Sequence, residues 1–205
     1  SKVTTMESMF YDAEKFNQEI GKWDVSKVTT MDHMFSFADS FNGDISKWNT
    51  GGLKRMNAMF ISADTFNQDI SKWDTSKVTH MSFAFYGAKA FSADLSKWDT
   101  SKVTHMYYMF MRATSFNGDI STWNTGKVTH MRHMFDGAKS FNGDISSWNT
   151  GKVMGMRDMF KNAKSFNQDL SGWNTESIKA NAQSTYVKKQ KLKNKLVNKL
   201  DWKPL

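Results

Sequence analysis

Acidic side chains recur with a 25-residue period along this chain of 205 residues, and stacked carboxylates could bind Ca²⁺. The recurring position holds Glu19, Asp44, Asp69, Asp94, Asp119, Asp144 and Asp169. Calcium requires about six to eight oxygen ligands, and the Gly-rich nonapeptide of calcium-binding β-rolls is absent here. Asparagine stands two residues before most of these acids, at Asn17, Asn42, Asn67, Asn117, Asn142 and Asn167. We therefore expect these side chains to satisfy backbone groups at a repeated turn, with no metal and no cofactor.

Three histidines follow the same spacing at His80, His105 and His130. Such a column could bind a metal or respond to pH near neutrality. The equivalent positions elsewhere hold Thr, Arg or Gly, so the residue type is not fixed along the chain. The sequence favours an exposed column without a function of its own.

Tryptophan recurs with the same period, and exposed indole rings could form a platform for sugars. The column comprises Trp23, Trp48, Trp73, Trp98, Trp123, Trp148 and Trp173. Its constancy favours core packing, because every stacked unit needs the same apolar plug. A sugar-binding platform remains the alternative. The recurring methionines are interpreted as core filler.

No catalytic motif stands out from the repeated columns. The chain has no G-x-S-x-G, no P-loop and no H-E-x-x-H. Candidate Asp, His and Ser residues all belong to repeated columns, whereas catalysis usually requires one unique arrangement. We therefore expect a protein that is not an enzyme. The absence of cysteine excludes a disulfide scaffold.

The elements that must position these columns are seven 25-residue units that together cover positions 1–175 of the chain. The units begin at Ser1, Ser26, Gly51, Ser76, Ser101, Gly126 and Gly151, and their residues are numbered here as positions 1–25. Met6, Met9, Phe10 and Ala13 have the i, i+3, i+4, i+7 spacing of a short helix. The D-I-S-x-W-D stretch that follows predicts a short strand bounded by turn residues. One unit cannot bury its apolar side alone, so the units must stack.

The predicted fold class is an α/β repeat solenoid, similar to leucine-rich repeats, with one short strand and one short helix per coil. Strands stack about 4.8 Å apart, whereas packed helices need about 8–10 Å. This mismatch predicts a bent stack with the strands on its concave side.

The run V-T-x-M-x-x-M-F-x-x-A-x-x-F-N-x-D-I-S-x-W-D/N resembles the 25-residue repeat of bacterial surface proteins from mycoplasmas, listeriae and lactic-acid bacteria. It is similar to the BspA-like leucine-rich repeats, with Met, Phe and Trp at many leucine positions. The resemblance implies a surface-exposed or secreted protein, including lipoproteins, with a role in adhesion. It implies no catalytic residue.

Differences between the units concentrate at positions 5, 7, 8, 11, 12, 14 and 15. On the predicted helix, positions 8, 11, 12 and 15 lie opposite the core stripe. Several of the variable residues are apolar or aromatic, and they form the predicted partner-binding patch: Phe37, Ile61, Phe83, Tyr86, Tyr107, Tyr108 and Met111. Exposed aromatic clusters are typical of contact surfaces. The alternatives are that these side chains turn inward or pack on a second copy.

Residues 176–205 form a basic tail that differs in kind from the units. They carry eight Lys against Glu176 and Asp201, most of the net charge of +8, so a basic nucleic-acid groove along the units is not expected. Ile178 and Ala182 predict the start of an eighth coil. The spacing of Leu192, Leu196 and Leu200 predicts an amphipathic helix that caps the stack. A contact with an anionic membrane or a partner is one alternative, and a linker is another.

The function predicted from the sequence is a non-enzymatic bacterial surface or secreted interaction module, adhesin-like, that binds a host or cell-surface protein. A carbohydrate-binding solenoid and a structural spacer of a larger surface protein are the alternatives. No specific nucleic-acid partner is expected. Because the chain begins without Met, we expect it to be a segment of a longer protein.

Overall fold

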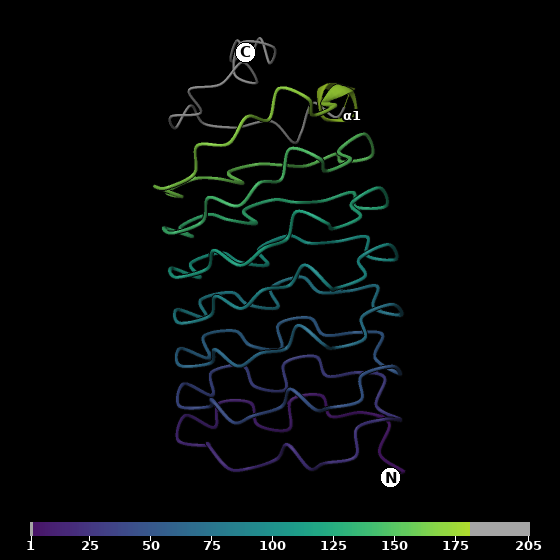
Figure 1. Ribbon diagram of the computed structural model, residues 1–205, viewed down its shortest axis with the longest axis vertical. Coiled ribbons are helices and arrows are strands. Elements are labelled where there is room, and N and C mark those ends of the chain that lie inside the picture. The colour runs from purple at the N-terminus through teal and green to yellow at the C-terminus, as the bar shows by residue number, and fades with distance from the viewer. Residues whose placement is uncertain (1, 181–205) are drawn as a thin grey trace.

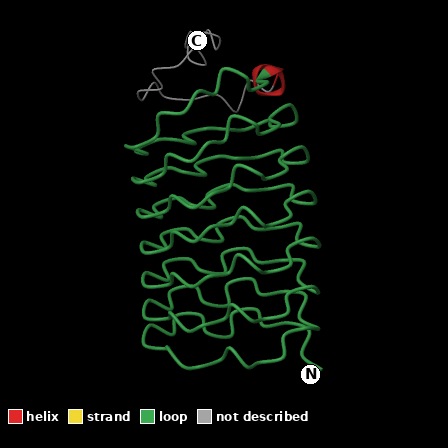
Figure 2. Ribbon diagram, viewed as in Figure 1, coloured by secondary structure: helices red, strands yellow, loops and turns green. Residues whose placement is uncertain are grey.

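The protein is a repeat solenoid in which each 25-residue unit forms one flat coil on top of the preceding one (Figure 1). The computed structural model describes residues 2–180. Nearly all of the described chain is loop and turn, as Figure 2 shows. The only helix of this range is α1 (Glu176–Ala180), at the end of the stack. The place of a sheet is taken by single parallel bridges at position 5, which run from Thr5 through Thr30 to Gly155.

Backbone hydrogen bonds join each coil to the next at every second residue of positions 6–12. In unit two, the N–H groups of Met31, His33, Phe35 and Phe37 donate to carbonyl oxygens of unit three at distances of 2.6–3.0 Å. The same pattern recurs in the other units. These bonds satisfy the backbone of a loop that would otherwise be costly to bury. The register between coils is therefore fixed by the main chain as well as by the side chains.

The helix predicted over positions 6–13 is wrong. Positions 8 and 12 have positive φ in every unit, for example 59° at Phe83 and 60° at Arg112, and an α-helix cannot contain such residues. Each segment is instead a succession of turns, in which the N–H three residues later donates back, as from Tyr86 to Phe83 at 3.0 Å. The Met and Phe side chains of these positions are buried in the inner coils, because turns closing over three residues reproduce much of the helical spacing.

The strand predicted over positions 19–24 is also wrong. This segment turns at Trp98, whose N–H donates to the carbonyl of Leu95 at 3.0 Å. The parallel bridges lie at position 5 instead. Because the coils contain neither the predicted helix nor the predicted strand, the spacing mismatch expected to bend the stack does not arise. Figure 1 shows the coils piled along the longest axis of the molecule.

The core is a two-dimensional array of parallel aromatic rings. Within one coil, Phe85 stacks on Phe91 with ring centroids 4.0 Å apart. Between coils, Phe85 stacks on Phe110 at 5.6 Å and Phe91 on Phe116 at 6.0 Å. Methionine, Ala and Ile or Leu columns pack around these rings and are fully buried in the middle of the stack. The predicted core columns are therefore confirmed.

The tryptophan column is part of this core. From Trp48 to Trp173 the side chains are at most 5% exposed, and Trp23 in the first coil is 39% exposed. The prediction of buried tryptophans is confirmed, and a sugar platform built from this column is excluded by its burial.

The chain starts an eighth coil at α1. Ile178 occupies position 3 of that coil and is buried, as the valines at position 3 of the inner coils are. Ser177 donates its hydroxyl hydrogen bond to the carbonyl of Gly151 at 2.6 Å. The predicted cap formed by Leu192, Leu196 and Leu200, and Ala182 before it, lie outside the described residues.

Candidate functional site

The constant asparagine and aspartate columns hold the turns of the coils. The Oδ1 atom of Asn42 accepts a hydrogen bond from the backbone N–H of Asn67 at 3.0 Å, and this pattern continues up the stack. The carboxylate of Asp69 accepts the N–H of Ser71 at 2.9 Å. The structural role predicted for these columns is confirmed. Their side-chain oxygens are occupied by backbone N–H groups.

Hydrogen bonds from the neighbouring serine lower the pKa values of several of these carboxyl groups. The hydroxyl and then the backbone N–H of Ser71 lower the pKa of Asp69, and Ser76 acts in the same way on Asp74. For Asp94 the backbone N–H of Ser96 is the larger cause of the lowered pKa, ahead of its hydroxyl. These groups are therefore ionised at neutral pH and contribute to the turns as acceptors.

The variable positions 5, 7, 8 and 11 bring eight rings together on one side of units four to six. We call this surface the aromatic face, and it comprises His80, Phe83, Tyr86, His105, Tyr107, Tyr108, His130 and His133. All eight side chains are half-buried. They come from three consecutive units, so only the stacking of the coils assembles them.

Two parallel rows of rings run up this face. In one row Phe83, Tyr108 and His133 stack with centroids 4.7 and 4.8 Å apart and planes within 8°. These residues stand at position 8, where φ is positive. In the other row His105 stacks with His80 at 6.3 Å and with His130 at 5.4 Å. The rings are therefore pre-organised rather than loose on the surface.

Tyr107 joins the two rows. Its ring is perpendicular to Phe83, Tyr108 and His105, with centroids 5.4, 6.0 and 5.9 Å away. Edge-to-face arrangements of this kind are a favourable geometry for aromatic pairs. The face is thus one connected cluster with Tyr107 at its centre.

Each histidine of this column contacts the hydroxyl of the threonine that directly precedes it in the sequence. The Nδ1 atoms of His80, His105 and His130 lie 2.8, 2.9 and 3.0 Å from the hydroxyls of Thr79, Thr104 and Thr129. Thr129 donates its proton to the carbonyl of Thr104, so its oxygen is an acceptor for an Nδ1–H of His130. Partial burial, His105 and Arg132 all lower the pKa of His130. The imidazole is therefore mainly neutral at physiological pH.

The predicted patch residues divide into a cluster and outliers. Phe83, Tyr86, Tyr107 and Tyr108 belong to the aromatic face. Met111 and Ile61 are half-buried and outside its ring contacts. Phe37 is exposed and contacts Tyr11 edge-on at 5.6 Å, nearer the first coil. The patch therefore contains four residues that the structure joins and three that it does not.

Sequence reasoning assigns no function to the histidines that join this cluster. His105 and His133 contact Tyr107 and Tyr108 directly, and His80 and His130 extend the row. The signal that could have found them is their position, because they occupy the same variable columns as the aromatic residues.

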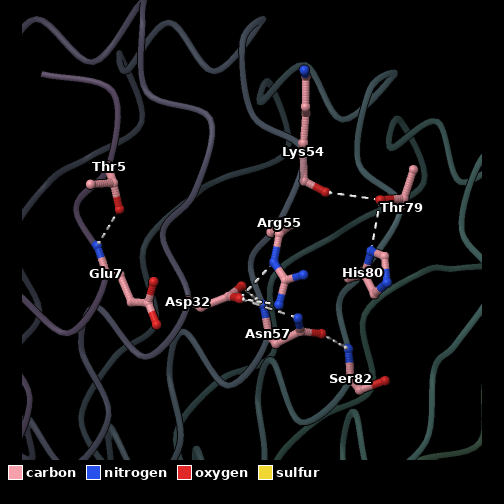
Figure 3. A network of polar contacts seen from close by, with 9 residues as sticks. All are labelled: Thr5, Glu7, Asp32, Lys54, Arg55, Asn57, Thr79, His80 and Ser82. Carbon is pink, nitrogen blue, oxygen red and sulfur yellow. Dashed lines mark hydrogen bonds and ion pairs between the residues drawn. The ribbon is translucent and has the colours of Figure 1, made fainter. Parts of the chain in front are cut away.

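In units two to four the same columns carry a polar network, drawn in Figure 3. Asp32 is buried and accepts hydrogen bonds from Arg55 Nε at 2.9 Å and from the N–H of Asn57 at 2.7 Å. Asn57 Oδ1 in turn accepts the N–H of Ser82 at 3.0 Å. Asp32, Arg55 and Asn57 satisfy one another, whereas the hydroxyl oxygen of the buried Ser82 has no hydrogen-bond partner among the described residues.

Neither a metal site nor a membrane-spanning helix is found in residues 2–180. No three His, Cys, Asp or Glu side chains in this range are arranged to hold a metal ion. No helix of the same range is long and apolar enough to cross a bilayer.

These features define a solenoid of stacked turn-rich coils with a constant core and a variable face. The family model described as "Mycoplasma protein of unknown function, DUF285" matches residues 1–98 and again residues 80–199. The chain belongs to this family.

No curated protein matches the sequence. Among solved structures, a chain from a crystal structure of a TLR13–ssRNA13 complex aligns with 69% of this chain and 23% of its own length. The sequence identity is 12% and the TM-score 0.28. This chain thus matches less than a quarter of that structure.

Proposed function

We propose that this protein is a non-enzymatic interaction module that binds a protein partner through the aromatic face. The observation that carries the proposal is the connected ring cluster around Tyr107, which lies in the columns that vary between units. Buried columns repeat because every coil must fit the next, whereas this cluster is confined to units four to six. A stacked coil needs no such cluster for its own stability.

The composition of the cluster supports a protein partner. Tyrosine supplies a large, rigid, amphipathic contact at low entropic cost, and it is enriched among the residues that dominate binding energy. The rings of Phe83, Tyr107 and Tyr108 already hold one another, so binding would order few side chains. A structural spacer, the alternative from the sequence, has no use for this arrangement.

We further propose that the module acts at the bacterial surface as an adhesin. Two points support this: the family is described from Mycoplasma, and the repeat resembles that of surface proteins with BspA-like leucine-rich repeats. A repeat solenoid offers an extended lateral face suited to contact with another cell. The partner would then be a host or cell-surface protein.

The test begins with the place of the protein on the cell. Intact cells that express it are treated with protease, and the protein is detected with an antibody before and after. The proposal predicts digestion at the same rate as a known surface protein, whereas protection until the cells are lysed would contradict it.

The second half of the test measures binding. Fluorescently labelled protein is applied to host epithelial cells and to a panel of immobilised extracellular proteins. The double variant Tyr107→Ser/Tyr108→Ser should lose binding while its thermal melt stays close to that of the wild type. The control Lys72→Ser/Lys97→Ser changes two exposed residues at position 22 and should bind normally. Absence of binding to any target, or equal binding by both variants, would contradict the proposal.

A further inference from the structure

Two rings of the aromatic face, those of Tyr108 and His105, have a stacked neighbour on each of their faces. Tyr108 has Phe83 against one face of its ring and His133 against the other, at 4.7 and 4.8 Å with near-parallel planes. His105 is sandwiched in the same way between His80 and His130. What remains open on these half-buried side chains is the ring edge. The edge carries the positive part of the aromatic quadrupole, so it favours negative charge.

The tyrosine hydroxyls of this face are available as hydrogen-bond donors. Within the part of the chain that the structure describes, no protein group hydrogen-bonds the hydroxyls of Tyr86, Tyr107 or Tyr108. Each can therefore donate to a carboxylate or a backbone carbonyl of a ligand.

Two exposed arginines, Arg112 and Arg132, come from the same units as the rings. Arg132 extends over Gly155 beside the histidine row, where a Cβ added to this glycine would lie 2.9 Å from Nε. Arg112 lies over Gly137, where the same construction gives 3.5 Å to Cγ. The missing side chain of Gly155 thus leaves room for Arg132, whereas a Cβ at Gly137 would be at ordinary contact distance from Arg112. Neither guanidinium has a carboxylate partner among the described residues, so both can pair with a ligand.

The charge of the aromatic face also favours a ligand that carries carboxylates. Over positions 4–12 of units four to six, the only carboxylate is Asp136. Asp136 is buried and its Oδ2 atom lies 3.1 Å from Nδ1 of His133. Over these positions the charged side chains on the surface are therefore the arginines, and no exposed acid stands with them.

We propose that the aromatic face binds an acidic segment of polypeptide, with its carboxylates paired to Arg112 and Arg132 and its backbone hydrogen-bonded to the tyrosine hydroxyls. This inference rests on the proposed function and specifies the partner. A single-stranded nucleic acid or a sugar would stack on open ring faces, and Tyr108 and His105 have a ring on each face already. Charge pairs at the edge of such a surface set the on-rate and the choice of partner.

The probe is a fluorescein-labelled peptide with the sequence Glu-Gly-Leu-Asp repeated three times, and binding is followed by fluorescence anisotropy at low and physiological salt. The comparison ligands are the same peptide with Lys in place of each acid, and a thymidine oligonucleotide of the same length. We expect saturable binding of the acidic peptide that weakens with salt, as charge pairing requires. The lysine peptide should not bind.

Charge reversal locates the site. Arg112→Glu/Arg132→Glu should weaken acidic-peptide binding by about tenfold or more, since it turns two attractions into repulsions. Lys72→Glu/Lys97→Glu changes the net charge of the protein equally at exposed position 22, and should weaken binding by less than about twofold. All four substitutions are on exposed side chains, so thermal melts should match the wild type.

Three results would overturn the inference: no saturable binding of the acidic peptide, equal loss in both charge-reversed proteins, or an oligonucleotide that binds as tightly and depends equally on Arg112 and Arg132. The experiments distinguish failure of the acidic-partner proposal from failure of the proposed function. A protein target that needs Tyr107 and Tyr108 but tolerates Arg112→Glu/Arg132→Glu would overturn the acidic partner and leave the interaction module standing.

Discussion

The indole N–H of Trp98 donates a hydrogen bond to the backbone carbonyl of Ile70 in the preceding unit, at 3.0 Å. Five other tryptophans make the same bond to position 20 of the unit before, at 2.9–3.1 Å. This bond satisfies the one polar atom of a buried indole. Each of these tryptophans therefore both fills the core of its own coil and holds the coil before it.

Trp98→Ala should lower the free energy of unfolding by about 3–5 kcal/mol, because it leaves a cavity and an unpaired carbonyl. Trp98→Phe should cost less, since it retains most of the packing. Trp23→Ala is the matched control, because Trp23 is 39% exposed in the first coil. Urea unfolding curves measure all three. An equal loss at Trp23 and Trp98 would contradict the assignment of the column to the core.

Gly118→Ala should destabilise the stack more than Gly143→Ala does, although both glycines stand at position 18. A Cβ at Gly118 would collide with the backbone carbonyl oxygen of Ala93, which cannot move without shifting the coil. At Gly143 the nearest atom is Cε2 of the Phe141 ring at 3.0 Å. We expect a difference of about 1–3 kcal/mol in the free energy of unfolding. Equal melting temperatures would show that the coils are not spaced as described.

The asparagine column, in which each side chain accepts the N–H of the next unit, is interrupted by Ser92. Its hydroxyl accepts the N–H of Asn117 at 3.3 Å, whereas Asn117 accepts the N–H of Asn142 at 2.8 Å. Ser92→Asn should therefore raise stability by about 0.5–1.5 kcal/mol. The converse change, Asn142→Ser, should lower it, because Asn142 also accepts from Gln168. Differential scanning calorimetry of the two variants measures these changes. Melting temperatures that shift in the same direction would contradict a stabilising role for the asparagine column.

Acid should destabilise the folded protein through the turn aspartates. Their folded-state pKa values are lowered by the serine hydrogen bonds, so the stability they contribute is present above the ordinary value of 3.8 and is lost as the pH falls below it. Asn49 makes the same turn bond, to Gly51 at 3.2 Å, and does not titrate. Asp74→Asn/Asp99→Asn should therefore flatten the fall in melting temperature between pH 5 and 2. An unchanged slope would assign the acid sensitivity to other groups.

The sequence predicts the stack and its core well, because seven aligned copies reveal which columns are apolar. It fails on local structure, because Met6, Met9, Phe10 and Ala13 have a spacing that successive turns share with a helix. A sign of the turns is present at position 12, which holds Gly87, Gly137 and Asn162 in three of the seven units. These types tolerate positive φ, and the structure has it there.

The candidate surface is predicted only in part, for a different reason. Phe83, Tyr107 and Tyr108 are near in sequence or one unit apart, so their clustering follows from the repeat. The inclusion of His105 and His133 depends on ring orientation between coils. Spacing alone does not show which rings stack and which only share a column.

Binding through the aromatic face is tested most directly by the dissociation constant of the cell or protein target for the wild type and for Tyr108→Ser, measured beside Lys97→Ser at exposed position 22. If the aromatic face is the binding surface, Tyr108→Ser alone should lose at least about 2 kcal/mol of binding free energy, roughly 30-fold in dissociation constant, with thermal melts close to the wild type. A dissociation constant that stays the same in Tyr108→Ser, in a protein that remains folded, would contradict the assignment of binding to the aromatic face.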